Sequence, residues 1–398
     1  MEKKTVFKHI LVTLTMLSGL ISTQLHAQTI DTIARNALLM DAETGTILLN
    51  KNSDQAFPPA SMSKLMTIYM ALDQIKSGDV SLQDEITITN DQWRRWRDLF
   101  KNEGSTMFLA VNDTVTLEDL LRGVIVLSGN DASVAIAEHL AGDEAAFAAW
   151  MNEKALEIGL ENSHFVNSTG WPAEGHEMSA RDLARLSQLL VNDFPDLYPM
   201  FGERRYLYKE HTGNQYNRNP LLGSFEGADG LKTGSTQEAG YCLTASAERD
   251  GRRLILVLAG LQNKSERNRE SQRLMGIGFR MFDNYHLFQA GEVVDHADVW
   301  LGERATIPLV VKDKQALTLS KRQRSGMKVT ISYSGPIPAP IVKGQPVAVM
   351  TITAPTMEPK TVELVAGDDV TAISGFGKLG AALKYMLFGA MPAQVTDQ

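Results

Sequence analysis

A serine and a lysine stand three positions apart in the segment Ser61-Met62-Ser63-Lys64. Residues i and i+3 of a helix share one side, so the Ser61 hydroxyl is expected beside the Lys64 amine. Serine is a poor nucleophile until a base takes its proton, and lysine is such a base when desolvation or a nearby positive charge destabilises its ammonium form. We therefore predict that Ser61 is a nucleophile and Lys64 its general base, although an isolated pair of this spacing would favour a surface helix start.

A second motif with chemical potential is Ser128-Gly129-Asn130. It interrupts a helical pattern over residues 117–141, and side chains at such a break can reach into a cleft. Ser128 can relay a proton to a leaving amine, and Asn130 can donate hydrogen bonds to a substrate amide and to Lys64. The alternative is an ordinary loop in which Asn130 caps the following helix.

The third motif, Lys232-Thr233-Gly234, is expected to precede a strand. Its lysine supplies charge for an anionic end group, Thr233 supplies a hydroxyl, and Gly234 allows close approach to the backbone. A substrate extended along that strand would gain main-chain hydrogen bonds. The backbone N–H groups of Ser61 and Ser235 are then expected to form an oxyanion hole.

The elements that must position these motifs mix strands and helices. Apolar residues at helical spacing predict a helix over residues 61–77, and Gly78 is expected to end it. A hairpin is expected over residues 36–49, two strands over 240–247 and 253–259, and a helix from about 265 to 285. The catalytic fold class is therefore α/β (α+β), and we place that domain at residues 28–290.

The composition changes after Gly291, where proline, valine and threonine become frequent and turn residues separate short strands. This pattern predicts a small all-β, sandwich-like domain over residues 291–372. Along 375–391 one helical face would carry apolar side chains, namely Phe376, Leu379, Leu383, Met386 and Leu387. We predict a membrane-anchoring tail over 373–398; the alternative is a helix that packs on the β domain or on another chain.

The first 27 residues are typical of a secretory signal, with Lys3, Lys4 and Lys8 before an apolar run and Ala27 at the cleavage point. An uncleaved anchor is the alternative. Their removal takes three lysines and one glutamate and moves the formal charge from −8 to −10. Such an acidic product is a poor candidate for nucleic-acid binding. Cys242 is the only cysteine, so no intramolecular disulfide forms.

In this order and with these gaps, the three motifs resemble those of the low-molecular-mass penicillin-binding proteins, specifically the serine DD-carboxypeptidases. The resemblance covers nearly the whole mature chain and is carried by residues 59–67, 128–132, 159–170, 230–234 and 239–241. It implies acylation of Ser61 by the D-Ala-D-Ala end of a peptidoglycan stem peptide, loss of the terminal D-Ala, and hydrolysis of the acyl-enzyme. It also implies covalent binding of β-lactams, with neither a cofactor nor a metal ion.

The same resemblance implies that Arg267 helps to hold the substrate carboxylate, although Arg269 and Arg273 lie close by. It further implies a periplasmic enzyme bound peripherally, through its tail, to the outer face of the inner membrane. One departure concerns Ser235, which stands where the family often has a basic side chain. We expect this difference to affect deacylation or the hold on the carboxylate.

Three rival functions share some of these motifs. A class A β-lactamase needs a glutamate in an E-x-x-L-N pattern, whereas residues 157–161 end in Glu161, and the β domain and tail do not belong to that enzyme. A DD-endopeptidase has the same motifs and stays open. A non-catalytic wall-binding scaffold would not need both Ser61 and Lys64. The basic, aromatic segment from Trp93 to Arg97 is expected to be a solvated face, with contact to glycan or lipid head groups as the alternative.

Overall fold

The computed structural model describes residues 30–100, 103–375, 380 and 396–397. The expected signal segment, residues 1–27, lies outside this part of the chain. So do the residues expected to form the apolar face of the tail, namely Phe376, Leu379, Leu383, Met386 and Leu387.

The first domain is built on a five-stranded antiparallel sheet with the strand order β2-β1-β7-β6-β5. Its strands are β1 (Asn36–Asp41), β2 (Ile47–Lys51), β5 (Ala228–Thr236), β6 (Gly240–Arg249) and β7 (Arg252–Leu261). The strand β5 stands at one edge of the sheet, so one side of its backbone is left for another extended chain.

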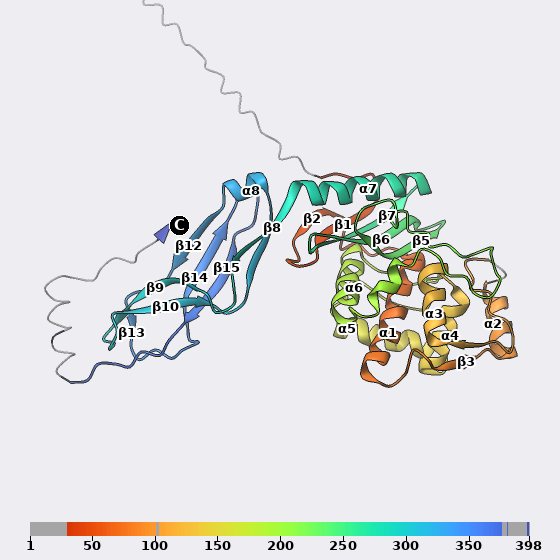
Figure 1. Ribbon diagram of the computed structural model, residues 1–398, viewed down its shortest axis with the longest axis horizontal. Coiled ribbons are helices and arrows are strands. Elements are labelled where there is room, and N and C mark those ends of the chain that lie inside the picture. Colours follow the sequence, from red (N-terminus) through yellow and green to blue (C-terminus); the bar gives the residue numbers. More distant parts are fainter. Residues whose placement is uncertain (1–29, 101–102, 376–379, 381–395, 398) are drawn as a thin grey trace, which may run out of the picture.

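The alternation of side chains along β7 shows how the sheet is covered on both faces. Successive strand residues point to opposite faces. Ile255, Val257 and Ala259 join the apolar core beneath the helices, whereas Leu254, Leu256 and Leu258 join a second core on the other face. The helix α7 (Lys264–Met281) contributes Leu274 and Met275 to that second core, and Figure 1 shows it lying across that side of the sheet.

A layer of helices covers the opposite face of the sheet (Figure 1). The two-stranded sheet of β3 (Glu85–Thr87) and β4 (Thr114–Thr116) lies within it. The other elements of the layer are η1 (Ala60–Ser63), α1 (Lys64–Ser77), α2 (Asn90–Phe100), α3 (Leu117–Arg122), η2 (Gly123–Leu127), α4 (Asn130–Ala141), α5 (Glu144–Glu157), α6 (Ala180–Asp193) and η3 (Tyr198–Gly202). The predicted helix over 61–77 is thus a 3-10 turn followed by α1, and Gly78 ends it with a φ of 85°.

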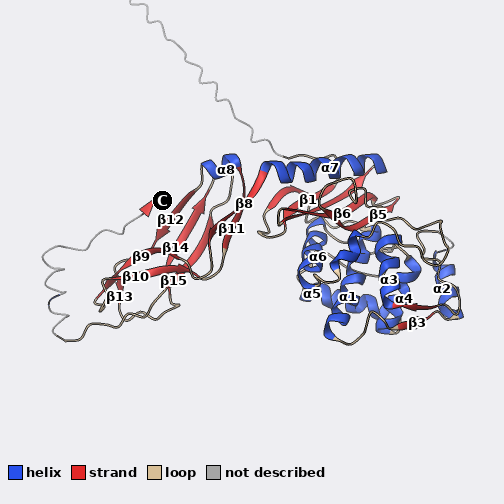
Figure 2. Cartoon of the chain, viewed as in Figure 1, coloured by secondary structure: helices blue, strands red, loops and turns tan. Residues whose placement is uncertain are grey.

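The second domain is almost entirely β-structure, as Figure 2 shows. A seven-stranded sheet has the order β13-β9-β10-β15-β14-β12-β16, and β8 and β11 form a two-stranded sheet. The bounds are β8 (Phe282–Phe288), β9 (Val293–Trp300), β10 (Thr306–Val311), β11 (Gln315–Ser320), α8 (Lys321–Ser325), β12 (Lys328–Ser332), β13 (Ile337–Pro338), β14 (Pro346–Thr353), β15 (Lys360–Ala366) and β16 (Thr396–Asp397). The predicted fold class, an α+β domain followed by an all-β domain, is confirmed.

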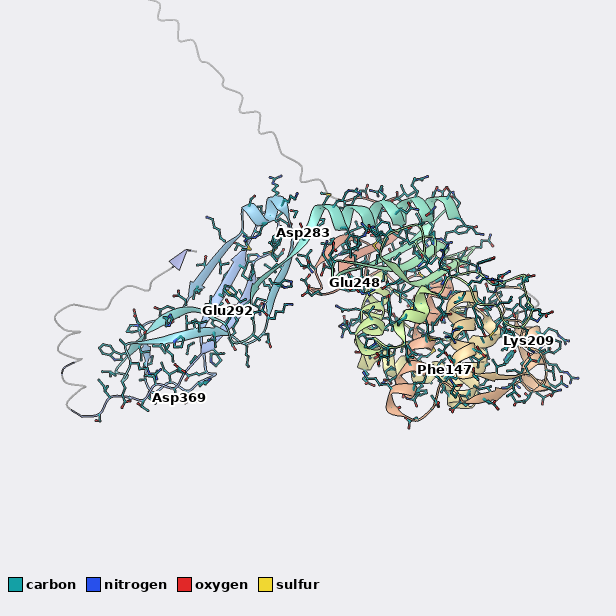
Figure 3. All side chains as sticks on the ribbon, in the orientation of Figure 1. Phe147, Lys209, Glu248, Asp283, Glu292 and Asp369 are labelled. Atoms are coloured by element: carbon teal, nitrogen blue, oxygen red, sulfur yellow. The ribbon has the colours of Figure 1, made fainter. Side chains whose placement is uncertain are left out.

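The helix α7 ends at Met281, and β8, the first strand of the second domain, begins at Phe282. From the sequence we expected a helix as far as about residue 285 and a domain boundary after residue 290. The difference comes from β8, whose apolar residues fit both helical and strand spacing. Pairing of Tyr285 with Leu317 in β11 makes it a strand of the second domain. Asp283 lies at this junction (Figure 3).

Polar contacts join the β1–β2 turn to the second domain. The amide of Asn284 donates to Asp41 Oδ1 at 3.1 Å and to Glu43 Oε2 at 2.9 Å. Lys314 Nζ pairs with Glu43 Oε1 at 2.8 Å, and this contact holds the pKa of the Glu43 carboxyl below its ordinary value. The turn that begins at Asp41 therefore contacts the β domain through these polar side chains.

Candidate active site

The nucleophile predicted from the sequence lies on a short 3-10 turn that enters α1. Ala60, directly before Ser61, has a φ of 50°, a conformation that non-glycine residues seldom adopt. Lys64 begins α1 and is fully buried. Its Nζ lies 3.0 Å from Ser61 Oγ, so the structure brings the two predicted residues into hydrogen-bond contact.

Lys64 has two further partners, and both are oxygen acceptors. Its Nζ donates to Asn130 Oδ1 at 2.8 Å and to the backbone carbonyl of Thr169 at 2.6 Å. Burial first, and then the positive charge of Arg218, lower the pKa of Lys64 to about 7. A neutral amine keeps two N–H groups for those acceptors, which leaves its lone pair facing the Ser61 hydroxyl.

The other serine of the motif has a different environment. Ser63 is buried, and its Oγ lies 2.8 Å from His176 Nε2. The backbone N–H of Val166 donates to His176 Nδ1 at 3.1 Å, so Nε2 carries the ring proton and donates to Ser63. Burial lowers the pKa of His176 to about 4, which keeps the ring neutral. Ser63 is therefore paired with His176, whereas Ser61 is the serine that contacts Lys64.

Ser128 lies at the break between η2 and α4 with a φ of 60°. Its Oγ accepts a hydrogen bond from Lys232 Nζ at 2.8 Å, so the second and third motifs meet there. From the sequence we expected Asn130 to donate a hydrogen bond to Lys64. The structure reverses that bond, because the lysine amine supplies the hydrogen and the amide oxygen accepts it.

The third motif lies within the edge strand β5, and not before a strand as the sequence suggested. Lys232, Thr233 and Gly234 pair with Thr244, Leu243 and Cys242 of β6, and this ladder overrides the weak strand propensity of the glycines. A Cβ on Gly234 would lie 2.9 Å from the carbonyl oxygen of Pro59. The glycine is thus needed for β5 to pack against the turn that carries the nucleophile. Ser235 is exposed on the same strand.

Basic side chains gather at one end of this cleft. Lys232 is buried, and burial followed by the charges of Lys64, Arg218 and Arg267 holds its pKa well below the ordinary value. Arg267 is also buried, with long hydrogen bonds of 3.4 Å to the carbonyls of Cys242 and Arg218. Its Nε is buried without a hydrogen-bond partner within the part of the chain that the structure describes. Such a cluster suits an anionic group.

Two residues of the site were missed from the sequence. Arg218 donates to Ser105 Oγ and to Asn214 Oδ1, each at 2.8 Å. Asp131 accepts hydrogen bonds from the Thr106 hydroxyl and from the backbone N–H groups of Met107 and Leu109, at 2.7 to 3.1 Å. Asp131 directly follows the second motif, which was a usable signal, whereas no local pattern marks Arg218.

No group of side chains suited to hold a metal ion occurs over the described ranges. Cys242 is buried, and burial raises the pKa of its thiol to about 11, so it is a packing residue. Over the same ranges, no helix combines the length and the apolar character that crossing a membrane requires.

A serine in contact with a fully buried lysine, beside the edge strand of a helix-covered antiparallel sheet, defines the class of this protein as a serine acyl-transfer enzyme. The model of the D-alanyl-D-alanine carboxypeptidase family matches residues 22–263, and the model of the C-terminal domain of penicillin-binding protein 5 matches residues 282–372. The chain belongs to the D-alanyl-D-alanine carboxypeptidase family.

Individual relatives support this assignment. The chain is 34% identical over 358 residues to the D-alanyl-D-alanine carboxypeptidase DacA of Escherichia coli, covering 89% of this chain and 87% of the relative. It is 32% identical over 351 residues to DacF of Bacillus subtilis, covering 87% of each. The crystal structure of penicillin-binding protein 5 from Haemophilus influenzae superposes with a TM-score of 0.77 at 33% identity, over 86% of this chain and 98% of that one.

Proposed function

We propose that this chain is a serine DD-carboxypeptidase that removes the terminal D-Ala from peptidoglycan stem peptides through an acyl-enzyme on Ser61. The observation that carries the assignment of the site is the 3.0 Å contact between Ser61 Oγ and the fully buried Nζ of Lys64. With a pKa of about 7, Lys64 is in part neutral at physiological pH and takes the Ser61 proton as the hydroxyl attacks.

The attack forms a bond from Ser61 Oγ to the carbonyl carbon of the penultimate D-Ala and converts the carbonyl oxygen into an oxyanion. The backbone N–H groups of Ser61 and Ser235 stabilise that charge. Collapse of the tetrahedral intermediate breaks the C–N bond, and the leaving D-Ala amine takes a proton through Ser128, which Lys232 contacts at 2.8 Å. Water then attacks the ester, with Lys64 as base, and returns the free enzyme and the shortened peptide.

Substrate binding follows from the edge position of β5 and from the basic end of the cleft. The peptide lies extended along β5, between Gly234 and Asn130, and the Asn130 amide donates to a substrate carbonyl. Its terminal carboxylate meets Lys232, Thr233 and Arg267, where the described residues leave Arg267 Nε unpartnered. A β-lactam carries an amide carbonyl and a carboxylate and binds in the same way, so it acylates Ser61.

The decisive experiment incubates the purified mature chain with a peptide that ends in Lys-D-Ala-D-Ala and quantifies free D-Ala. We expect release that is lost in both Ser61→Ala and Lys64→Ala, with circular-dichroism melts that show a folded protein. D-Ala release by Ser61→Ala would refute the assignment. Labelling of Ser61 by a fluorescent penicillin without D-Ala release would favour the endopeptidase.

For the location of the enzyme, we propose export by the signal segment 1–27 and attachment of the tail, residues 373–398, to the outer face of the inner membrane. The support is the charge and apolar pattern of each segment. Truncation before Gly375 is expected to retain D-Ala release and to abolish cosedimentation with anionic vesicles. A truncated chain that still pellets with vesicles would refute the role of the tail.

A further inference from the structure

A cavity of about 390 Å³ has Asn130 in its lining and therefore adjoins the catalytic residues. The helix α2 and residues between Glu103 and Leu109 contribute to its walls, with aromatic and polar side chains. Its lining includes Trp93, Trp96, Arg97, Phe100, Phe108 and Asn130. The volume and the mixture of aromatic walls with a few polar groups are typical of a ligand pocket. The basic, aromatic segment of the sequence is thus not merely a solvated face, because Trp96 is buried in this wall.

Contacts link one end of this cavity directly to the catalytic residues. Phe100 packs edge-on against Trp171 with ring centroids 5.5 Å apart. A Cβ on Gly104 would meet both Trp171 and the Asn130 amide within 2.8 Å, so this segment closes tightly on the rim of the active site. Asn130 in turn contacts Lys64 at 2.8 Å. Only the side chains of Asn130 and Lys64 therefore lie between this end of the cavity and Ser61.

The other end of the cavity is formed by the first turns of α2. Trp93 and Phe100 both line the cavity and lie seven positions apart on this helix, which corresponds to about 10 Å along its axis. The guanidinium of Arg97 lies over the Trp93 ring at 5.1 Å from its centroid. The far end thus presents a flat indole and a cation, which also pairs with Asp98 Oδ1 at 3.3 Å.

The side chains that line the cavity indicate which part of the substrate can bind there. The stem residues on the acyl side of the cleaved bond are alanines, an acidic residue and a diamino acid, none of which offers a broad apolar face. A pyranose ring presents C–H groups on its faces and hydroxyls at its edge, which matches an indole wall with an arginine at the rim. Four extended residues span at most about 14 Å, and the cavity that Trp93 lines shares Asn130 with the catalytic site, so we expect a sugar that carries the stem to enter this cavity.

We propose that this cavity binds the N-acetylhexosamine to which the stem peptide is attached, so that the enzyme recognises the glycan together with the peptide. The inference rests on the proposed carboxypeptidase function. Trp93 supplies the stacking surface, and Arg97 holds the indole and donates to the ring substituents. A soluble peptide without sugar would then occupy only part of the binding site.

The test compares the KM for D-Ala release from a disaccharide-pentapeptide and from the same pentapeptide without sugar. We expect a lower KM for the disaccharide-linked substrate with the wild-type enzyme. Trp93→Ala is expected to reduce the KM ratio of the two substrates by roughly 3- to 10-fold, the value of one aromatic contact. Arg97→Ala acts in the same direction. The matched control is Arg94→Ala, which removes the same charge from an exposed position of α2 outside the cavity lining.

Equal KM values for the two substrates with the wild-type enzyme would overturn the proposal, as would a KM ratio unchanged by Trp93→Ala. If neither substrate releases D-Ala, the carboxypeptidase function fails, and the cavity is then tested alone. For that test Ser61→Ala is titrated with the free disaccharide of N-acetylglucosamine and N-acetylmuramic acid, and tryptophan fluorescence is followed. A saturable change that Trp93→Ala removes supports the site, and no change overturns it.

Discussion

Lys232 Nζ and Ser128 Oγ lie 2.8 Å apart, although 104 positions separate the two residues in the chain. The cleft therefore contains a second Ser–Lys contact besides that of Ser61 with Lys64. Both lysines are buried, and the positive charge of Lys64 contributes to the lowered pKa of Lys232. A proton leaving Ser61 for Lys64 thus enters a cluster that favours its onward transfer to the leaving amine.

The first prediction concerns the pH dependence of acylation. Lys64 must be neutral to act as base, and its pKa is lowered from 10.5 to about 7 by burial and by Arg218. We expect the second-order rate constant for acylation by a penicillin to rise tenfold per pH unit below 7 and to level off above it. Labelling followed from pH 5 to 9 checks this, with Ser61→Ala as the blank. A rate that is flat across that range would contradict the assignment of Lys64.

The lowered pKa of Lys64 also makes the stability of the folded chain depend on pH. Between about pH 7 and 10.5 the unfolded chain holds a proton on Lys64 that the folded chain has lost. This lysine therefore makes the free energy of unfolding increase with pH across that window.

A second prediction follows from the charge that lies near Lys64. After burial, the positive charge of Arg218 is the main cause of the lowered pKa of Lys64. Arg218→Gln removes that charge, so the midpoint of the acylation profile should move to higher pH. The position of the midpoint, and not the plateau rate, is the readout, because Arg218 also belongs to the basic end of the cleft. A midpoint that stays in place or moves to lower pH would show that this charge does not act on the base.

The third prediction tests the carboxylate site. A hydrogen bond to a charged group contributes about 1.5 to 3 kcal/mol, which corresponds to roughly 10- to 150-fold in affinity. We expect Arg267→Ala to raise the KM for a D-Ala-D-Ala peptide by a factor in this range. A peptide with a C-terminal amide should bind more weakly to the wild-type enzyme, and the variant should distinguish acid from amide by a smaller factor, because only Lys232 and Thr233 are left to bind the carboxylate. A variant that keeps the full preference for the acid would exclude Arg267 from this role.

Much of the site could be predicted from the sequence because its strongest constraint is local. The three-residue spacing of Ser61 and Lys64 on a helical turn fixes their contact before any tertiary structure forms. The break at Ser128 was likewise visible as an interruption between two helical patterns. The fold class followed from apolar runs such as that of β7, which predicted strands between the helices, and from the shift to short strands after α7.

What the sequence could not provide depends on contacts between distant segments. Arg218 reaches the cleft only because its loop folds back on Ser105, more than a hundred positions earlier. The strand β8 has apolar residues that suit a helix as well, and only its pairing with β11 decides the outcome. Tertiary packing, and not a local propensity, also places the third motif inside β5.

The fourth prediction addresses the contact between β5 and the turn that carries the nucleophile. In Gly234→Ala the new Cβ would lie 2.9 Å from the Pro59 carbonyl oxygen and 3.1 Å from the Ala60 Cβ, so the strand or the turn must shift. Overpacking of this kind costs about 1 to 3 kcal/mol, and the shift separates the strand from Ser61. We expect a lower melting temperature together with slower penicillin acylation, measured on the same preparation.

Gly213→Ala is the matched control for this substitution, because a Cβ there meets its nearest neighbour, Phe108, at an ordinary 3.9 Å. It should leave both the melting temperature and the acylation rate close to those of the wild-type protein. If Gly234→Ala has the same melting temperature and acylation rate as the control, then a Cβ at this position fits without moving β5 or the turn. The glycine of the third motif would in that case be needed only for the approach of substrate.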